Sequence, residues 1–181
     1  MLAADSFSNG LPQLKDLSMF CCRSSPSLSI AHLISLKTLS LGHFPDLCFL
    51  EGLSSLYLQN LHLTEVRNLS VEFISQFRVQ ESLTVSNIEL LNHMLMAEDF
   101  TIPLSLSLQD CKESSVTFEE SASFSSVKHL RLCDSEMKYL PKNLKCLSSL
   151  KNLDIHACPN ISSLPDLPST LQRMTYGTVN S

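Results

Sequence analysis

Carboxylates, imidazoles and thiols are the side chains of this 181-residue sequence whose spacing could support chemistry. Glu119 and Glu120 are adjacent, and a pair of carboxylates can serve as general acid and general base. They lie in a stretch rich in serine and glutamate, 112–126, and no motif near them pairs them with a partner acid, a nucleophile or a metal ligand. We therefore expect this stretch to be a solvated loop on the convex side of the molecule.

The histidines and cysteines also lack the spacing of a metal or redox site. The histidines are scattered singly, at His32, His43, His62, His93, His129 and His156. There are seven cysteines, an odd number, and no C-x-x-C pair. We expect Cys22, Cys111 and Cys158, which occupy equivalent positions, to be buried structural thiols, and we expect no bound metal.

Catalytic and nucleotide-binding motifs are missing from the sequence. There is no G-x-x-x-x-G-K-[ST], G-x-G-x-x-G, G-x-S-x-G or H-E-x-x-H. Four glycines offer little material for a loop that cradles phosphate. We expect this chain to be neither an enzyme nor a cofactor-binding protein.

The elements that position these side chains are indicated by the apolar spacing between Leu147 and Pro165. The apolar residues fall at Leu147, Leu150, Leu153, Ile155, Cys158, Ile161 and Leu164. This is the leucine-rich-repeat pattern L-x-x-L-x-L-x-x-N/C-x-L, in which a strand and a return segment make one coil. Leu153 and Ile155 then point inward from the strand, while Asp154 and His156 point outward. Ile161 and Leu164 are expected to return the chain to the interior.

The same core position recurs along the whole chain, because one coil cannot bury its own apolar edge. The recurring residues are Leu17, Leu39, Leu56, Leu83, Leu106, Leu130, Leu153 and, in a degenerate eighth copy that also includes Leu171 and Tyr176, Met174. All steps but one lie in the range of about 20–29 residues typical of this repeat. The exception is the step of 17 residues from Leu39 to Leu56.

We therefore predict an α/β fold: a single leucine-rich-repeat solenoid over residues 1–181, with about seven to eight irregular repeats. A parallel β-sheet is expected on the concave face. The convex segments are expected to be mostly irregular or short helices, with one candidate helix from Asn92 to Phe100. Repeat residues begin at Leu11 without a preceding cap, and the carboxyl terminus is equally bare, so we expect the chain to be part of a longer protein.

Composition and the termini restrict the class of partner. The net charge is −5, from 13 basic and 18 acidic residues, with no basic stripe of the kind that phosphate backbones require, so nucleic acid is not an expected partner. The amino terminus lacks a basic segment followed by an apolar run, so no signal peptide is predicted. No run of about 18 apolar residues would cross a membrane. A cytoplasmic location is expected.

The outward positions of the strands form the candidate binding surface. One column is predicted to run Asp16, Thr38, Ser55, Ser82, Ser105, His129, Asn152, Arg173, and the next Ser18, Ser40, Tyr57, Thr84, Ser107, Arg131, Asp154, Thr175. Arg131 and Asp154 should lie directly across from each other and pair. Repeat arrays bind proteins on such faces, and interfaces concentrate their energy in aromatic and arginine anchors. The candidate protein-binding residues are therefore Tyr57, His129, Arg131, Asp154 and His156.

The stretch from Tyr139 to Met174 carries a family resemblance. Its doubled Leu-Pro and its Ile-x-x-Cys-Pro-x-Ile (Ile155 to Ile161) resemble the carboxy-terminal repeats of plant intracellular nucleotide-binding leucine-rich-repeat (NBS-LRR) disease-resistance proteins, particularly the grass coiled-coil class. The resemblance implies a role in defence: the repeats would sense a pathogen effector, directly or through a guarded host protein, and hold the receptor's own nucleotide-binding domain inactive. The nucleotide-binding motifs of that family are missing here, so nucleotide binding does not carry over.

One alternative comes from another class of protein, the leucine-rich substrate-recruiting part of a ubiquitin ligase subunit. Its repeats also end in cysteine. An F-box helix pair encoded upstream would favour the ligase, and a phosphate-loop module would favour the receptor. The sequence identifies neither the effector, nor the guarded protein, nor the full-length architecture.

Overall fold

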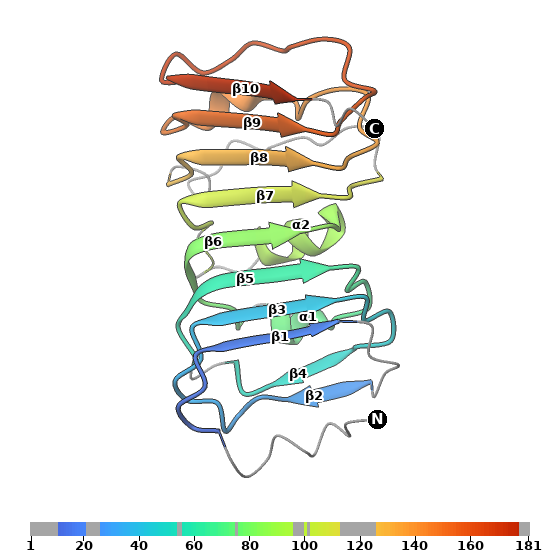
Figure 1. The fold of residues 1–181 in the computed structure, drawn as a ribbon, viewed down its shortest axis with the longest axis vertical. Coiled ribbons are helices and arrows are strands. Elements are labelled where there is room, and N and C mark those ends of the chain that lie inside the picture. Colours follow the sequence, from blue (N-terminus) through green and yellow to red (C-terminus); the bar gives the residue numbers. More distant parts are fainter. Residues whose placement is uncertain are drawn as a thin grey trace.

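The structure is a computed structural model that describes residues 11–20, 26–53, 56–74, 76–95, 100, 102–112 and 126–177. Within these residues, eight parallel strands form one sheet, in which each strand pairs with the strand of the next coil (Figure 1). The strands are β1 (Asp16–Phe20), β3 (Thr38–Gly42), β5 (Leu58–Thr64), β6 (Val79–Val85), β7 (Ser105–Gln109), β8 (His129–Cys133), β9 (Asn152–His156) and β10 (Arg173–Gly177). The predicted leucine-rich-repeat solenoid is confirmed.

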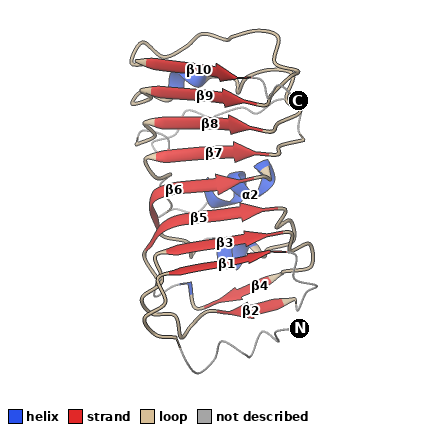
Figure 2. Ribbon diagram, in the orientation of Figure 1, coloured by secondary structure: helices blue, strands red, loops and turns tan. Residues whose placement is uncertain are grey.

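The returning segments are largely irregular, as expected, but they include a second sheet that was not predicted. Strands β2 (Ser27–Ser29) and β4 (Phe49–Glu51) pair in parallel, separately from the main sheet (Figure 2). The described helices are α1 (Val71–Ile74) and α2 (Ile88–Leu95), with a 3-10 turn at Leu144–Cys146. Helix α2 begins four residues before the candidate helix at Asn92. It begins there because the side-chain oxygen of Asn87 accepts the Glu89 N–H at 2.8 Å, which caps the helix.

The core is built from the inward residues of the strands. From β3 to β9 the first inward position is occupied by Leu39, Leu61, Leu83, Leu106, Leu130 and Leu153, each at most 1% exposed. Each leucine packs between its equivalents on the two neighbouring strands, so the apolar edge of one coil is covered by the next. Cys111 and Cys158 are buried as predicted, while Cys22 lies outside the described residues.

The predicted register of the third repeat is wrong. Leu39 pairs with Leu61, and Leu61 pairs with Leu83, so Leu61 rather than Leu56 holds the core position. The outward neighbours Thr38, Asn60 and Ser82 are accordingly separated by equal steps of 22 residues, and the short step disappears. Leu56 is buried as well, at 3% exposed, because it leads the chain into β5.

A second expectation fails at the end of the last coil. Leu164 is 54% exposed, whereas Leu140, its equivalent one coil earlier, is 2% exposed. The segment that carries Leu164 covers the coil of Leu140. No further coil among the described residues covers Leu164 itself, so its side chain remains in solvent.

The chain leaves the sheet through the same turn in most coils. The residue after the strand has a left-handed backbone, with φ between 50° and 58°, at His43, Glu65, Asp110, Asp134 and Ala157. Its N–H donates to the neighbouring coil; the Asp134 N–H reaches the His156 carbonyl at 3.1 Å, for example. Aspartate tolerates this conformation better than most residues. The turn therefore places acidic residues along the edge where the strands end.

Candidate functional site

A groove of about 470 Å³ crosses the outward face of strands β5 to β8, which we call the sheet face. Its floor consists of small hydroxyl side chains, Ser82 and Thr84 on β6 and Ser105 and Ser107 on β7. Ser82 pairs with Ser105 and Thr84 with Ser107, so the floor is two strands wide. The flanking strands carry larger residues, so the change in side-chain size across the sheet produces the hollow.

One wall of the groove is His62 on β5. Its Nδ1 lies 3.0 Å from the Thr84 hydroxyl, so the ring is fixed against the floor. Burial lowers the pKa of His62, because a charged imidazolium loses hydration there. The ring is therefore neutral at pH 7 and contributes a polar but uncharged wall.

The opposite wall is formed by His129 and Arg131 on β8. The Asn152 amide nitrogen lies 2.7 Å from Nδ1 of His129, so the amide donates and the imidazole accepts. Arg131 faces Asp154, with an N–O distance of 3.9 Å and side chains 58% and 27% exposed. A loose, exposed ion pair of this kind contributes about 0–1 kcal/mol to the stability of the fold. The guanidinium therefore remains available to a partner.

The floor continues towards β3 as a hydrogen-bonded ladder. Asn60 donates from its amide nitrogen to the Thr38 hydroxyl at 3.4 Å and accepts from the Ser82 hydroxyl at 2.7 Å. These bonds run between neighbouring strands and fix three side chains in one arrangement. A partner that binds here meets an ordered polar surface, which reduces the entropy lost on binding.

Cys133 lines the groove near the carboxyl end of β8. Burial raises the pKa of its thiol, and this effect exceeds the opposing effect of the nearby Arg131 charge. Since the thiolate is the nucleophilic form, Cys133 is a poor nucleophile at neutral pH.

The structure brings together three of the five candidate residues. His129, Arg131 and Asp154 line the groove, and Arg131 lies directly across from Asp154 as predicted. His156 is on the same face but outside the groove lining, beside Gly177. A Cβ atom on Gly177 would be 3.1 Å from the imidazole, so glycine leaves room for the ring.

The predicted placement of Tyr57 is wrong. Tyr57 precedes β5 and is 71% exposed, while His62 takes the outward position between Ser40 and Thr84. The error follows from the shifted register of the third repeat, and it also caused His62 to be missed. The alternation Leu61-His62-Leu63, with equal steps to both neighbouring repeats, is the signal that could have identified it.

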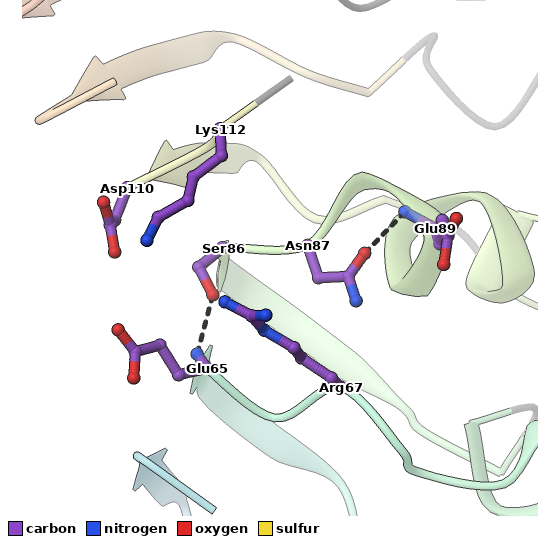
Figure 3. A pocket seen from close by; sticks show the side chains of 7 residues that line it. All are labelled: Glu65, Arg67, Ser86, Asn87, Glu89, Asp110 and Lys112. Atoms are coloured by element: carbon purple, nitrogen blue, oxygen red, sulfur yellow. Dashed lines mark hydrogen bonds between the residues drawn. The ribbon is translucent and has the colours of Figure 1, made fainter. Parts of the chain in front are cut away.

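A second cavity, of about 250 Å³, lies where the chain turns away from β5, β6 and β7 (Figure 3). Carboxylates and cations both line it: Glu65, Glu89 and Asp110 with Arg67 and Lys112. The Glu65 N–H donates to the Ser86 hydroxyl at 2.7 Å and so ties two turns together. In the described part of the chain, no group of three or more His, Cys, Asp or Glu side chains is arranged to hold a metal ion.

The described residues contain no helix that is long and apolar enough to span a membrane. Comparison of the chain with protein-family models, curated proteins and solved structures gives no match.

Proposed function

We propose that this chain is a protein-binding scaffold whose sheet face holds a partner in the groove between His62 and Arg131. The observation that supports the proposal is the groove itself: an ordered hydroxyl floor, one neutral wall, and an exposed arginine on the other. Arginine is among the residues that dominate binding energy when a partner excludes water from them. The floor supplies hydrogen-bonding groups for a polar main chain or side chain.

The same residues favour binding over catalysis. The imidazoles of His62 and His129 each bond to a neighbouring side chain, Thr84 and Asn152. The thiol of Cys133 remains protonated at neutral pH because burial raises its pKa. Covalent catalysis usually requires an accessible nucleophile whose adjacent base is oriented by a third group. The hydroxyl of Thr84 does contact the His62 imidazole, but Thr84 is buried and, among the described residues, no carboxylate bonds to that ring.

The family resemblance of the stretch from Tyr139 to Met174 suggests which class of protein this scaffold belongs to. We place the chain in the repeat region of a cytoplasmic plant immune receptor, with a pathogen effector, a guarded host protein or the receptor's own nucleotide-binding domain as partner. Sequencing the complete transcript tests this assignment. A phosphate-loop module upstream supports the receptor, and an F-box helix pair supports the ubiquitin ligase subunit instead.

Photo-crosslinking tests the binding surface. A photoreactive amino acid is placed at Gln109, at the rim of the groove, or at Lys138, an exposed residue of the returning segment between β8 and β9. The full-length gene product carrying either substitution is irradiated in cells, and the adducts are identified by mass spectrometry. We expect a defined protein adduct from position 109 and none from position 138. The same adducts from both positions, or adducts from position 138 alone, would contradict the proposal.

A further inference from the structure

Four cations lie on strands β8 and β10 or immediately before β8 and β9, and we call them the basic patch: Lys128, Arg131, Lys151 and Arg173. Lys128 and Lys151 are neighbours at the amino ends of β8 and β9, since the Lys151 N–H donates to the Lys128 carbonyl at 2.9 Å. Arg173 and His129 lie on either side of Asn152 in the register of the sheet. All four cations are exposed.

The charge of the basic patch is largely uncompensated. Among the described residues, its one ion pair joins Arg131 to Asp154 at 3.9 Å, and Lys128, Lys151 and Arg173 form none. Three of the four cations thus have no ion-pair partner among the described residues, in a chain whose net charge is −5. Concentrated charge of one sign attracts a partner of the opposite sign and selects against the wrong one.

The opposite edge of the sheet carries acidic residues, which Arg67 and Lys112 accompany at the turns after β5 and β7. The turns that follow β5, β7 and β8 place Glu65, Asp110 and Asp134 at the carboxyl ends of these strands. Because every strand runs in the same direction, the amino ends share one edge and the carboxyl ends share the other. An anionic segment is therefore attracted towards the amino ends of β8 to β10, whereas at the far end of β8 it meets the carboxylate of Asp134.

We propose that the basic patch binds an acidic segment, rich in aspartate or glutamate, of the protein partner. The segment extends from the groove, where Arg131 is common to both sites, across the amino ends of β9 and β10. This inference rests on the proposed function and specifies the chemistry of the partner. The hydroxyls of Ser105 and Ser107 on the floor can donate hydrogen bonds to carboxylates, and the basic patch supplies the charge.

Fluorescence anisotropy with defined probes tests this inference. The probes are a fluorescein-labelled peptide rich in glutamate, a lysine-rich peptide of the same length and a single-stranded DNA of matched charge. We expect the glutamate-rich peptide to bind most tightly, with an affinity that falls as salt rises. Arg131→Ala, Lys151→Ala and Arg173→Ala should each weaken binding by about two- to fivefold. Lys138→Ala, which removes the same charge from the returning segment, should leave the affinity unchanged.

Three results would overturn the inference: no preference for the glutamate-rich peptide, an equal loss of affinity with Lys138→Ala, or DNA that binds as tightly as that peptide. The last result would indicate a general polyanion site. Failure of the inference is distinguishable from failure of the proposed function. If position 109 still crosslinks to a protein while the glutamate-rich peptide does not bind, the sheet face binds a partner of different chemistry. If the peptide binds but position 109 yields no protein adduct, the proposed function fails.

Discussion

Replacing Leu153 by alanine should destabilise the protein by about 2–5 kcal/mol. The side chain is fully buried and packs in register between Leu130 and Met174. Burial stabilises by about 0.8 kcal/mol per methylene group, which gives about 2.4 kcal/mol for the three carbon atoms lost. The cavity left between the neighbouring coils adds to this loss. Met174 is only half-buried, so it can move partly into the space, which favours the lower half of the range.

Leu164→Ala is the matched control, because it makes the same chemical change within the same repeat at a side chain that is 54% exposed. It should change the free energy of unfolding by no more than about 0.5 kcal/mol. Urea unfolding followed by circular dichroism gives both values. Hydrogen exchange should show that the amides of β9 and β10 lose protection first in Leu153→Ala, since each coil is stabilised by its neighbours. Equal urea midpoints for the two variants would refute the assigned inward register.

Leu61→Ala should cost about 2–5 kcal/mol in urea unfolding, because Leu61 is fully buried, whereas Tyr57→Ala should cost under about 0.5 kcal/mol. A cost for Leu61→Ala as small as that for Tyr57→Ala would contradict the core position assigned to Leu61. Burial lowers the pKa of His62 in the folded state. Near and below about pH 6.5 the unfolded chain therefore binds more protons at this residue than the folded chain does, and stability decreases as the pH decreases. His62→Gln should show a smaller fall in urea midpoint between about pH 7.5 and about pH 5.5, and an unchanged fall would exclude His62 as a source. Ser135 is buried and its hydroxyl donates to the Cys111 carbonyl at 2.9 Å, so Ser135→Ala should lower the melting temperature, corresponding to a loss of about 1–3 kcal/mol. An unchanged melting temperature would show that this hydrogen bond adds no net stability.

The repeat and its inward positions are predictable from sequence for a physical reason. An inward strand residue such as Leu130 or Leu153 lies between two neighbouring strands and accepts only an apolar side chain, so the pattern is strict. Around Leu56 to Leu63 this reasoning is insufficient. Leu56 and Leu58 are buried, at 3% and 1%, as are Leu61 and Leu63, at 0% and 1%. Burial then cannot distinguish Leu61 and Leu63, the two inward positions of the repeat, from the leucines that precede them, and only pairing with both neighbouring strands decides.

The candidate site was predictable where the period is regular. Arg131 and Asp154 were expected to face each other because β8 and β9 belong to well-matched repeats. The groove was not predicted, since it depends on small residues on β6 and β7 between larger ones on β5 and β8. His62 was missed for the same reason that Tyr57 was misplaced. The small sheet of β2 and β4 was also missed, because its strands have only three residues each, too few to establish an alternation in the sequence.

The central claim, that the sheet face is the surface that binds a protein partner, is tested most directly by measuring one affinity in two matched variants. Arg131→Ala and Lys138→Ala each remove one exposed positive charge, the first from the groove and the second from the returning segment. Both are compared with the parent chain by calorimetry against the protein captured from position 109, after circular dichroism confirms folding. We predict that Arg131→Ala weakens binding about tenfold or more while Lys138→Ala has no effect. Unchanged binding with Arg131→Ala, or an equal loss with Lys138→Ala, would contradict the claim.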